Sequence, residues 1–212
     1  MIYELDFNDN NEFKKLYDLY LLFSEDIKTK NGIINKNNII FNVYQGDITK
    51  GIKWTWGINE LSINYFDQFL KSINLYQRLE NLFNNKFQIG GVSFITLYTN
   101  EILEKDSTFH LDIMSQYDNS DTNIITVLIP LEMSKNAGNL QYKIGNIVNT
   151  YKYKKNKLAV WDSCKIWHRT EPFSNEHNQE RVILSLNMMT DEPWAKNALK
   201  RCIGSQGNII RY

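Results

Sequence analysis

Short runs of β-forming residues, separated by turn-forming clusters, fill residues 87–190, and this pattern constrains the fold more than any other feature. The runs are FQIGGVSFITLYT, TNIITVLIPLE, NLQYKIG, IVNTYKYK, KLAVWD and RVILSLNMM, and turn-forming clusters such as residues 118–121 and 135–138 separate them. Strands this short and closely spaced favour antiparallel sheets in a sandwich or barrel. We therefore predict a mainly β core.

Helical patterns precede this core. Residues 11–23 and 60–83 place apolar side chains three and four positions apart, which predicts two amphipathic helices. Between them, NIIFNVYQG has the composition of a strand. Helices followed by strands indicate an α+β protein in which the N-terminal helices pack on one sheet. We expect a single domain over residues 1–212, with a mainly helical support (1–86), a β core (87–190) and a C-terminal tail (191–212).

The charge balance limits the partners of the chain. It has 24 basic and 24 acidic residues and a pI of about 6.8, so no excess positive charge favours nucleic acid or an anionic membrane. The first residues do not resemble a signal peptide, and no run reaches the roughly 20 apolar residues of a membrane span. The two cysteines form no C-x-x-C pair and are expected to be reduced. We expect a soluble, cytoplasmic protein with no membrane partner, and the charge balance disfavours a nucleic-acid partner; the oligomeric state stays open.

Two of the three histidines lie in a pattern typical of a metal site. In an extended chain, the side chains of His110 and Asp112 point to the same side and can reach one ion. His168 follows the predicted strand KLAVWD and can supply a third ligand. Two histidines and one carboxylate form the facial triad of non-haem Fe(II) oxygenases, which leaves positions for a 2-oxo acid and dioxygen.

Arg181 begins the predicted strand RVILSLNMM. Period-two alternation places Arg181, Ile183, Ser185 and Asn187 on one face of that strand. An arginine on a partly polar inner face requires an anionic partner, and a guanidinium pairs in bidentate fashion with a carboxylate. The alternative is an ordinary surface arginine at a strand end.

The order His110-x-Asp112, His168, Arg181 resembles the H-x-D … H … R pattern of the Fe(II)/2-oxoglutarate-dependent oxygenase superfamily. The stretches AGNLQY and KLAVWDSCKIWHRTEPF resemble two further segments of that superfamily. The resemblance covers roughly residues 87–190. It implies a double-stranded β-helix (jelly roll), Fe(II) at the triad, and 2-oxoglutarate and O2 as co-substrates.

Further residues are assigned to the pocket with less support. By resemblance, Tyr98 hydrogen-bonds 2-oxoglutarate. We also assign Ser185 to co-substrate binding because it shares the face of Arg181, although it lies about 13 Å along the strand. The slot two residues after Arg181, often Ser or Thr in this superfamily, is Ile183 here, which puts the identity of the oxo acid in doubt. We assign Trp54, Trp56 and Trp167 to the substrate pocket on position alone, and a core role for them stays open.

The resemblance implies hydroxylation of a C–H bond in a small molecule or peptide substrate, either a free amino acid or a peptidyl or protein side chain. Two alternatives remain. A nucleic-acid demethylase of the same superfamily shares the pattern R-x-x-L-[ST], but the second arginine usual in those enzymes is Asn187 here. A non-catalytic jelly-roll module that binds a metal or another ligand is the other alternative.

Overall fold

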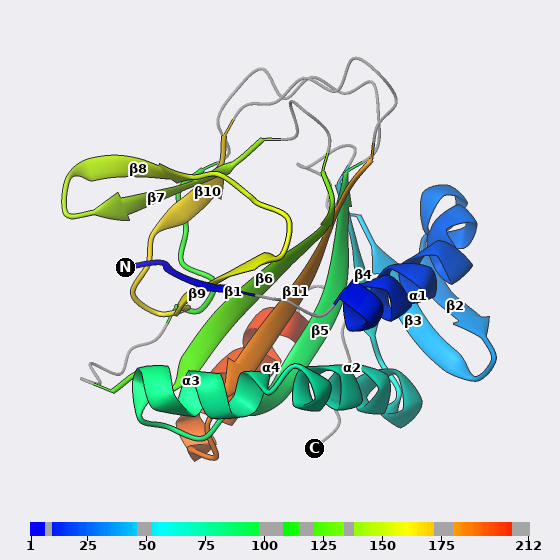
Figure 1. Cartoon of the computed structure of the whole chain (residues 1–212), viewed down its shortest axis with the longest axis horizontal. Coiled ribbons are helices and arrows are strands. Elements are labelled where there is room, and N and C mark those ends of the chain that lie inside the picture. The colour runs from blue at the N-terminus through cyan, green and yellow to red at the C-terminus, as the bar shows by residue number, and fades with distance from the viewer. Residues whose placement is uncertain are drawn as a thin grey trace.

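Two antiparallel sheets form the core of the protein (Figure 1). The computed structural model describes residues 1–6, 10–45, 52–97, 108–114, 121–133, 138–171 and 180–204. The larger sheet has eight strands, in the order β1 (Tyr3–Asp6), β9 (Lys157–Asp162), β6 (Ile124–Glu132), β11 (Arg181–Met189), β5 (Gln88–Leu97), β4 (Ile52–Gly57), β3 (Ile39–Tyr44) and β2 (Gly32–Lys36). The smaller sheet has three strands, in the order β10 (His168–Thr170), β7 (Leu140–Ile144) and β8 (Ile147–Tyr151).

From β5 onward the chain passes back and forth between the two sheets. It leaves the large sheet after β5, pairs at His110 with β10, returns as β6, crosses to β7 and β8, and returns as β9. It then crosses to β10 and ends the core in β11. This alternation is the topology of a jelly roll. The mixed architecture with mainly antiparallel strands confirms the predicted α+β class with a mainly β core.

The N-terminal segment contains more strands than the sequence pattern predicts. β1 pairs with β9, and the meander β2-β3-β4 continues the large sheet beyond β5. These strands have four to six residues each, and distant partners stabilise them, so local sequence signals do not reveal them. They cover two strands that would otherwise be the edges of the jelly roll.

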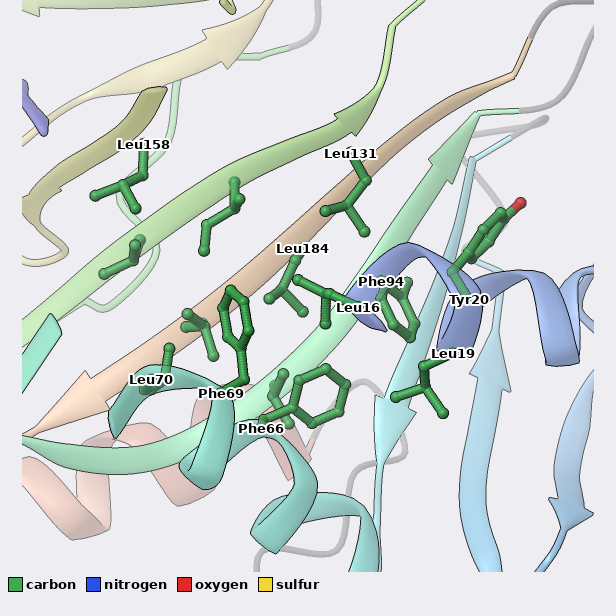
Figure 2. Close-up of a cluster of buried hydrophobic side chains, with 14 of the residues drawn as sticks. Leu16, Leu19, Tyr20, Phe66, Phe69, Leu70, Phe94, Leu131, Leu158 and Leu184 are labelled. Atoms are coloured by element: carbon green, nitrogen blue, oxygen red, sulfur yellow. The ribbon is translucent and has the colours of Figure 1, made fainter. Parts of the chain in front are cut away.

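Three helices contribute to the main hydrophobic core: α1 (Asn10–Thr29), α2 (Glu60–Ser72) and α3 (Leu75–Phe83). The predicted helix 60–83 is interrupted at Asn74, which has a left-handed φ of 53° that asparagine tolerates better than most residues. Figure 2 shows side chains of α1 and α2 gathered with Phe94 of β5 and Leu184 of β11. The Phe94 ring meets those of Tyr20 and Phe66 edge to face, at centroid distances of 5.6 Å each.

A fourth helix, α4 (Pro193–Gly204), forms within the segment expected to be only a C-terminal tail. Its buried residues Ala195, Ala198, Leu199 and Ile203 pack in a second cluster with Trp56 and Ile113. In the described part of the chain, no helix is both long and apolar enough to cross a membrane.

A buried lysine joins β4 to the end of α1. Lys53 is 8% exposed, and its ammonium group donates hydrogen bonds to the carbonyls of Ile27, Lys28 and Lys30 at 2.9, 2.9 and 3.0 Å. The last carbonyls of a helix have no partners within the helix, and a positive charge there interacts favourably with the helix dipole. Lys53 therefore caps α1 from the neighbouring sheet.

Replacing Lys53 with Met, which is of similar length, should lower the free energy of unfolding by roughly 2 to 3 kcal/mol because carbonyls at the end of α1, one of them buried, lose a charged donor. Urea denaturation followed by tryptophan fluorescence measures this change. Lys14→Met is the matched control, since Lys14 makes only an exposed ion pair with Asp18 and should change stability by less than about 1 kcal/mol. Equal effects of the two substitutions would contradict the capping role.

Candidate metal centre and adjoining cavity

A single β-bridge brings the two sequence-distant histidines together. The amide of His110 donates to the carbonyl of His168 at 3.0 Å, and the amide of His168 donates to the carbonyl of His110 at 2.9 Å. Residues directly opposite each other in an antiparallel pair place their side chains on the same face. The imidazole rings accordingly lie 4.6 Å apart, centroid to centroid.

Each imidazole is oriented by its own backbone. His110 Nδ1 donates to the carbonyl of Thr108 at 2.9 Å, and His168 Nδ1 donates to the carbonyl of Ile166 at 3.0 Å. A carbonyl can only accept, so Nδ1 carries a proton in both rings, and in the neutral form of each ring Nε2 has the lone pair that a metal ion needs. One ligand atom from each of His110, Asp112 and His168 can be chosen such that all three lie within 4.8 Å of one another.

Asp112 and His168 are electrostatically coupled, with Oδ1 and Nε2 3.3 Å apart. Burial by itself raises the pKa of Asp112, but the charge and hydrogen bond of His168, with a hydrogen bond from Thr126, lower it overall. Burial by itself lowers the pKa of His168, yet Asp112 and the carbonyl of Ile166 raise it overall. The site therefore favours an ionised carboxylate that attracts a positive charge, either a proton or a metal ion.

A buried polar network supports the carboxylate from behind. Thr126 Oγ1 donates to Asp112 Oδ2 at 2.6 Å, which leaves Oδ1 on the side of the histidines. The Thr126 hydroxyl has one proton, so it accepts from Ser163 Oγ at 2.8 Å and from Asn187 Nδ2 at 3.4 Å. Partners of this kind fix the orientation of metal ligands.

A cavity of about 360 Å³ lies against the three side chains. This volume is in the range of small-molecule sites. Its walls come from the large sheet, the β10–β7 side of the small sheet, and Cys202 and Ile203 of α4. The indole of Trp161 meets the ring of His168 edge to face at 5.1 Å, which covers the inner side of that histidine.

Arg181 also lines this cavity and is 3% exposed. Its Nη1 donates to the carbonyl of Gly138 at 3.0 Å. Gly138 has a φ of 68°, a left-handed conformation that glycine adopts without strain. Burial lowers the pKa of Arg181, and Tyr153 opposes that effect. A guanidinium nevertheless stays charged in proteins, so Arg181 is a buried cation at the cavity wall.

The structure places only some of the other predicted pocket residues in the cavity wall. Trp54, Trp56 and Ser185 line the cavity. Trp167 is not among the lining residues, and 46% of its surface is exposed. It precedes His168 in an extended segment, so an inward histidine places the tryptophan on the outer face. Tyr98 lies outside the described residues.

Several lining residues were not predicted from the sequence. Thr126 lies in β6, where eight consecutive residues are buried and no alternation distinguishes the cavity face. Tyr153 and Thr170 also line the cavity, and burial raises the pKa of Tyr153 to about 12 against the opposing charge of Arg181. The phenol of Tyr153 is therefore a neutral donor near that arginine. The sequence places it in a lysine-rich turn, which gives no signal for a buried role.

The comparisons with known proteins rest on structure, since no family sequence model and no curated protein sequence matches the chain. A prolyl 4-hydroxylase from Pseudomonas putida is 13% identical with a TM-score of 0.57, and the match covers 90% of this chain and 93% of that one. A prolyl hydroxylase from Trichoplax adhaerens, solved with a peptide fragment of hypoxia inducible factor, is 17% identical with a TM-score of 0.60, covering 90% and 84%.

HygX from Streptomyces hygroscopicus, solved with nickel and 2-oxoglutarate, is 8% identical with a TM-score of 0.56, and the match covers 90% of this chain and 83% of HygX. A further similar structure, from Burkholderia pseudomallei, is described as a member of the 2-oxoglutarate-Fe(II) oxygenase family. The similarity includes both sheets of the jelly roll, because it extends over nine-tenths of the chain. The chain therefore has the double-stranded β-helix fold of the Fe(II)/2-oxoglutarate-dependent oxygenases.

Proposed function

We propose that the protein is an Fe(II)- and 2-oxoglutarate-dependent dioxygenase that hydroxylates a C–H bond. One observation carries the proposal: the ligand atoms of His110, Asp112 and His168 converge on the wall of a cavity that also contains the buried cation Arg181. Two imidazoles and one carboxylate are the donor set of non-haem Fe(II) oxygenases. A structural zinc site would require a fourth protein ligand, and the described residues supply only these three.

The residues present fit both the metal and the oxo acid. The deprotonated Nε2 atoms of the two histidines and Asp112 Oδ1 would hold the ion, and Arg181 would pair with the distal carboxylate of 2-oxoglutarate. When bound, iron with 2-oxoglutarate and dioxygen would supply the oxidising chemistry. The chain itself orients the ligands through backbone carbonyls and Thr126, and Trp161 shields the metal centre from water.

In related proteins, the hydroxyl of a Ser or Thr two residues after the arginine binds the same carboxylate as the arginine. Tyr153 and Thr170 can take that role here. Both line the cavity that contains Arg181, and the charge of Arg181 acts to lower the pKa of Tyr153 against the effect of burial. A neutral phenol donates a hydrogen bond to a carboxylate. The departure at Ile183 therefore does not weigh against 2-oxoglutarate. We also propose that residues 87–190 form the catalytic core.

For the substrate, a small molecule or a peptide fits best. The Trichoplax adhaerens enzyme was solved with a peptide, and HygX was solved with hygromycin B. Apart from the metal-binding histidines, the described cavity lining has one basic side chain, Arg181, which the oxo acid would occupy. A nucleic-acid substrate would require further cations for its phosphates, so we rank demethylation of nucleic acids lower.

Anaerobic addition of Fe(II) and 2-oxoglutarate should produce a weak visible charge-transfer band. His110→Ala and His168→Ala should lose it because two protein ligands cannot retain the ion in the required geometry. Absorption spectroscopy with a matched blank measures the band. No band in the unaltered protein would contradict the enzyme proposal and favour the non-catalytic binding module.

Replacing Arg181 with Met should raise the 2-oxoglutarate concentration needed for half of this band by at least ~10-fold, because a charge-assisted pair is lost. The affinity for Fe(II) alone should change little. Arg169→Met is the control, since Arg169 bonds to Gln141 and lies outside the cavity lining. If the two variants need the same 2-oxoglutarate concentration, another group binds the co-substrate.

Thr126→Val keeps the shape of the side chain and removes the hydroxyl that orients Asp112. We expect the dissociation constant for the metal to rise roughly 10- to 100-fold, as for other residues that hold a metal ligand in place. Competition with a coloured chelator measures this constant, and Thr126→Ser should restore most of the affinity. Loss of affinity in both variants would indicate a packing defect instead.

A further inference from the structure

A row of polar side chains crosses three adjacent strands of the large sheet. Trp56 of β4 is paired with Ser93 of β5, and Ser93 is paired with Ser185 of β11. Residues directly opposite in antiparallel strands share a face, with Cβ atoms about 5 Å apart. All three residues line the cavity, so they form one polar strip on its floor.

Two members of this strip lack hydrogen-bond partners within the described part of the chain. They are the indole Nε1 of Trp56 and the hydroxyl Oγ of Ser93, in residues that are 3% and 1% exposed. A buried donor without a partner costs about 1–3 kcal/mol. Native proteins satisfy most such groups, so exceptions at a cavity wall indicate where a ligand supplies the missing partner.

The strip runs from β11 across β5 to β4, whereas Thr126, which supports Asp112, lies in β6 on the other side of β11. Ser185 is about 13 Å along β11 from Arg181, whereas it is only about 7 Å from Asn187. Asn187 bonds to Thr126, which bonds to Asp112. A dicarboxylate extended from Arg181 along β11 toward the metal would pass Ser185 and leave Ser93 and Trp56, in β5 and β4, free for the other substrate.

The strip is uncharged, and this limits what it can bind. Among the described lining residues, the only groups with a full charge are Arg181 and the metal-ligand set. A zwitterionic amino acid placed here would bury an ammonium and a carboxylate without charged partners, which is costly. An indole N–H only donates, so its partner must be an acceptor, and a neutral oxygen satisfies it without that cost.

We propose that Trp56, Ser93 and Ser185 form the substrate-positioning subsite, which binds an uncharged oxygen acceptor of the substrate: an amide carbonyl or a hydroxyl group. This inference rests on the proposed function for the identity of the second ligand. It favours a substrate whose charges are blocked, as in a peptide, over a free amino acid. A neutral polyol offers the same chemistry.

The test uses ¹⁵N-labelled protein with Zn(II) in place of Fe(II) and saturating 2-oxoglutarate. The Trp56→Phe spectrum assigns the indole N–H resonance of Trp56. The probes are N-acetyl-N′-methylamides of the common amino acids, the corresponding free amino acids, and methyl glycosides as the hydroxyl arm. We expect a neutral probe to shift the Trp56 resonance. A shift with the blocked amino acids identifies the acceptor as an amide, and a shift with the methyl glycosides identifies it as a hydroxyl group.

Ser93→Ala and Trp56→Phe should each weaken binding of that probe by ~10-fold, while the affinity for 2-oxoglutarate stays the same. Trp167→Phe, outside the cavity, is the matched control and should bind normally. Circular dichroism verifies folding, and the smaller Ser93→Ala change keeps the test valid if Trp56→Phe unfolds. If the protein did not bind 2-oxoglutarate, the proposed function would be wrong but the subsite would still be testable. The neutral probes would then be titrated into metal-free protein.

Three results would overturn the subsite. The first is tighter binding of free amino acids than of their blocked forms. The second is binding of a neutral probe with no shift of the Trp56 resonance, and the third is no binding of any neutral probe.

Discussion

The paired backbone hydrogen bonds between His110 and His168 are the constraint on which the rest of the site depends. They join segments far apart in the chain and belong to neither of the extended strand ladders. Because the two residues are directly opposed, their side chains must share a face, and Asp112 follows on that face at the next position of the same alternation. Thr126 of the large sheet then fixes the orientation of the carboxylate with a single hydrogen bond.

The sheet that supports this site carries an unusual number of buried polar groups. Arg181, Ser185, Asn187, Thr126 and Ser93 are each at most 8% exposed. Some of them satisfy one another, as in the network behind Asp112, but others do not. Unsatisfied groups reduce stability, and the large aromatic core on the opposite face of the sheet offsets that cost. Buried polar groups without partners at a cavity wall are consistent with ligand binding rather than with a purely structural role.

Much of the strand pattern could be predicted from the sequence, because short β-branched runs and turn clusters carry local signals. The six expected runs correspond to β5, β6, β7, β8, β9 and β11. β10 has only three residues, and its pairing with β7 is non-local, so no period identifies it. Helix α4 carries an apolar stripe of Ala195, Ala198, Leu199 and Ile203 at three- and four-residue spacing, so the sequence contained a signal that the prediction of a tail missed. Two of these residues are small alanines, and the stripe is buried against Trp56 and Ile113, which the chain supplies from elsewhere.

The site was less predictable than the fold because it combines motif residues with residues that only tertiary contacts select. His110, Asp112, His168 and Arg181 stand out through their chemistry and spacing. Thr126, Ser93 and Tyr153 are ordinary residue types in strands or turns, and only their place on the cavity wall distinguishes them. Trp167 shows the converse: its proximity to a ligand in sequence suggested a pocket role, yet alternation turns it outward.

Strand β11 shows how the hydrophobic core positions the chemistry. All nine of its residues are buried, so it is covered on both faces. Val182, Leu184, Leu186 and Met188 belong to the core beneath the helices, while Arg181, Ile183, Ser185 and Asn187 line the cavity. A slip of one residue would move the polar set into the core and the apolar set into the cavity, which would be costly on both faces. The register that the core enforces therefore also sets the distance from the arginine to the polar strip, and with it the space between the proposed co-substrate and substrate sites.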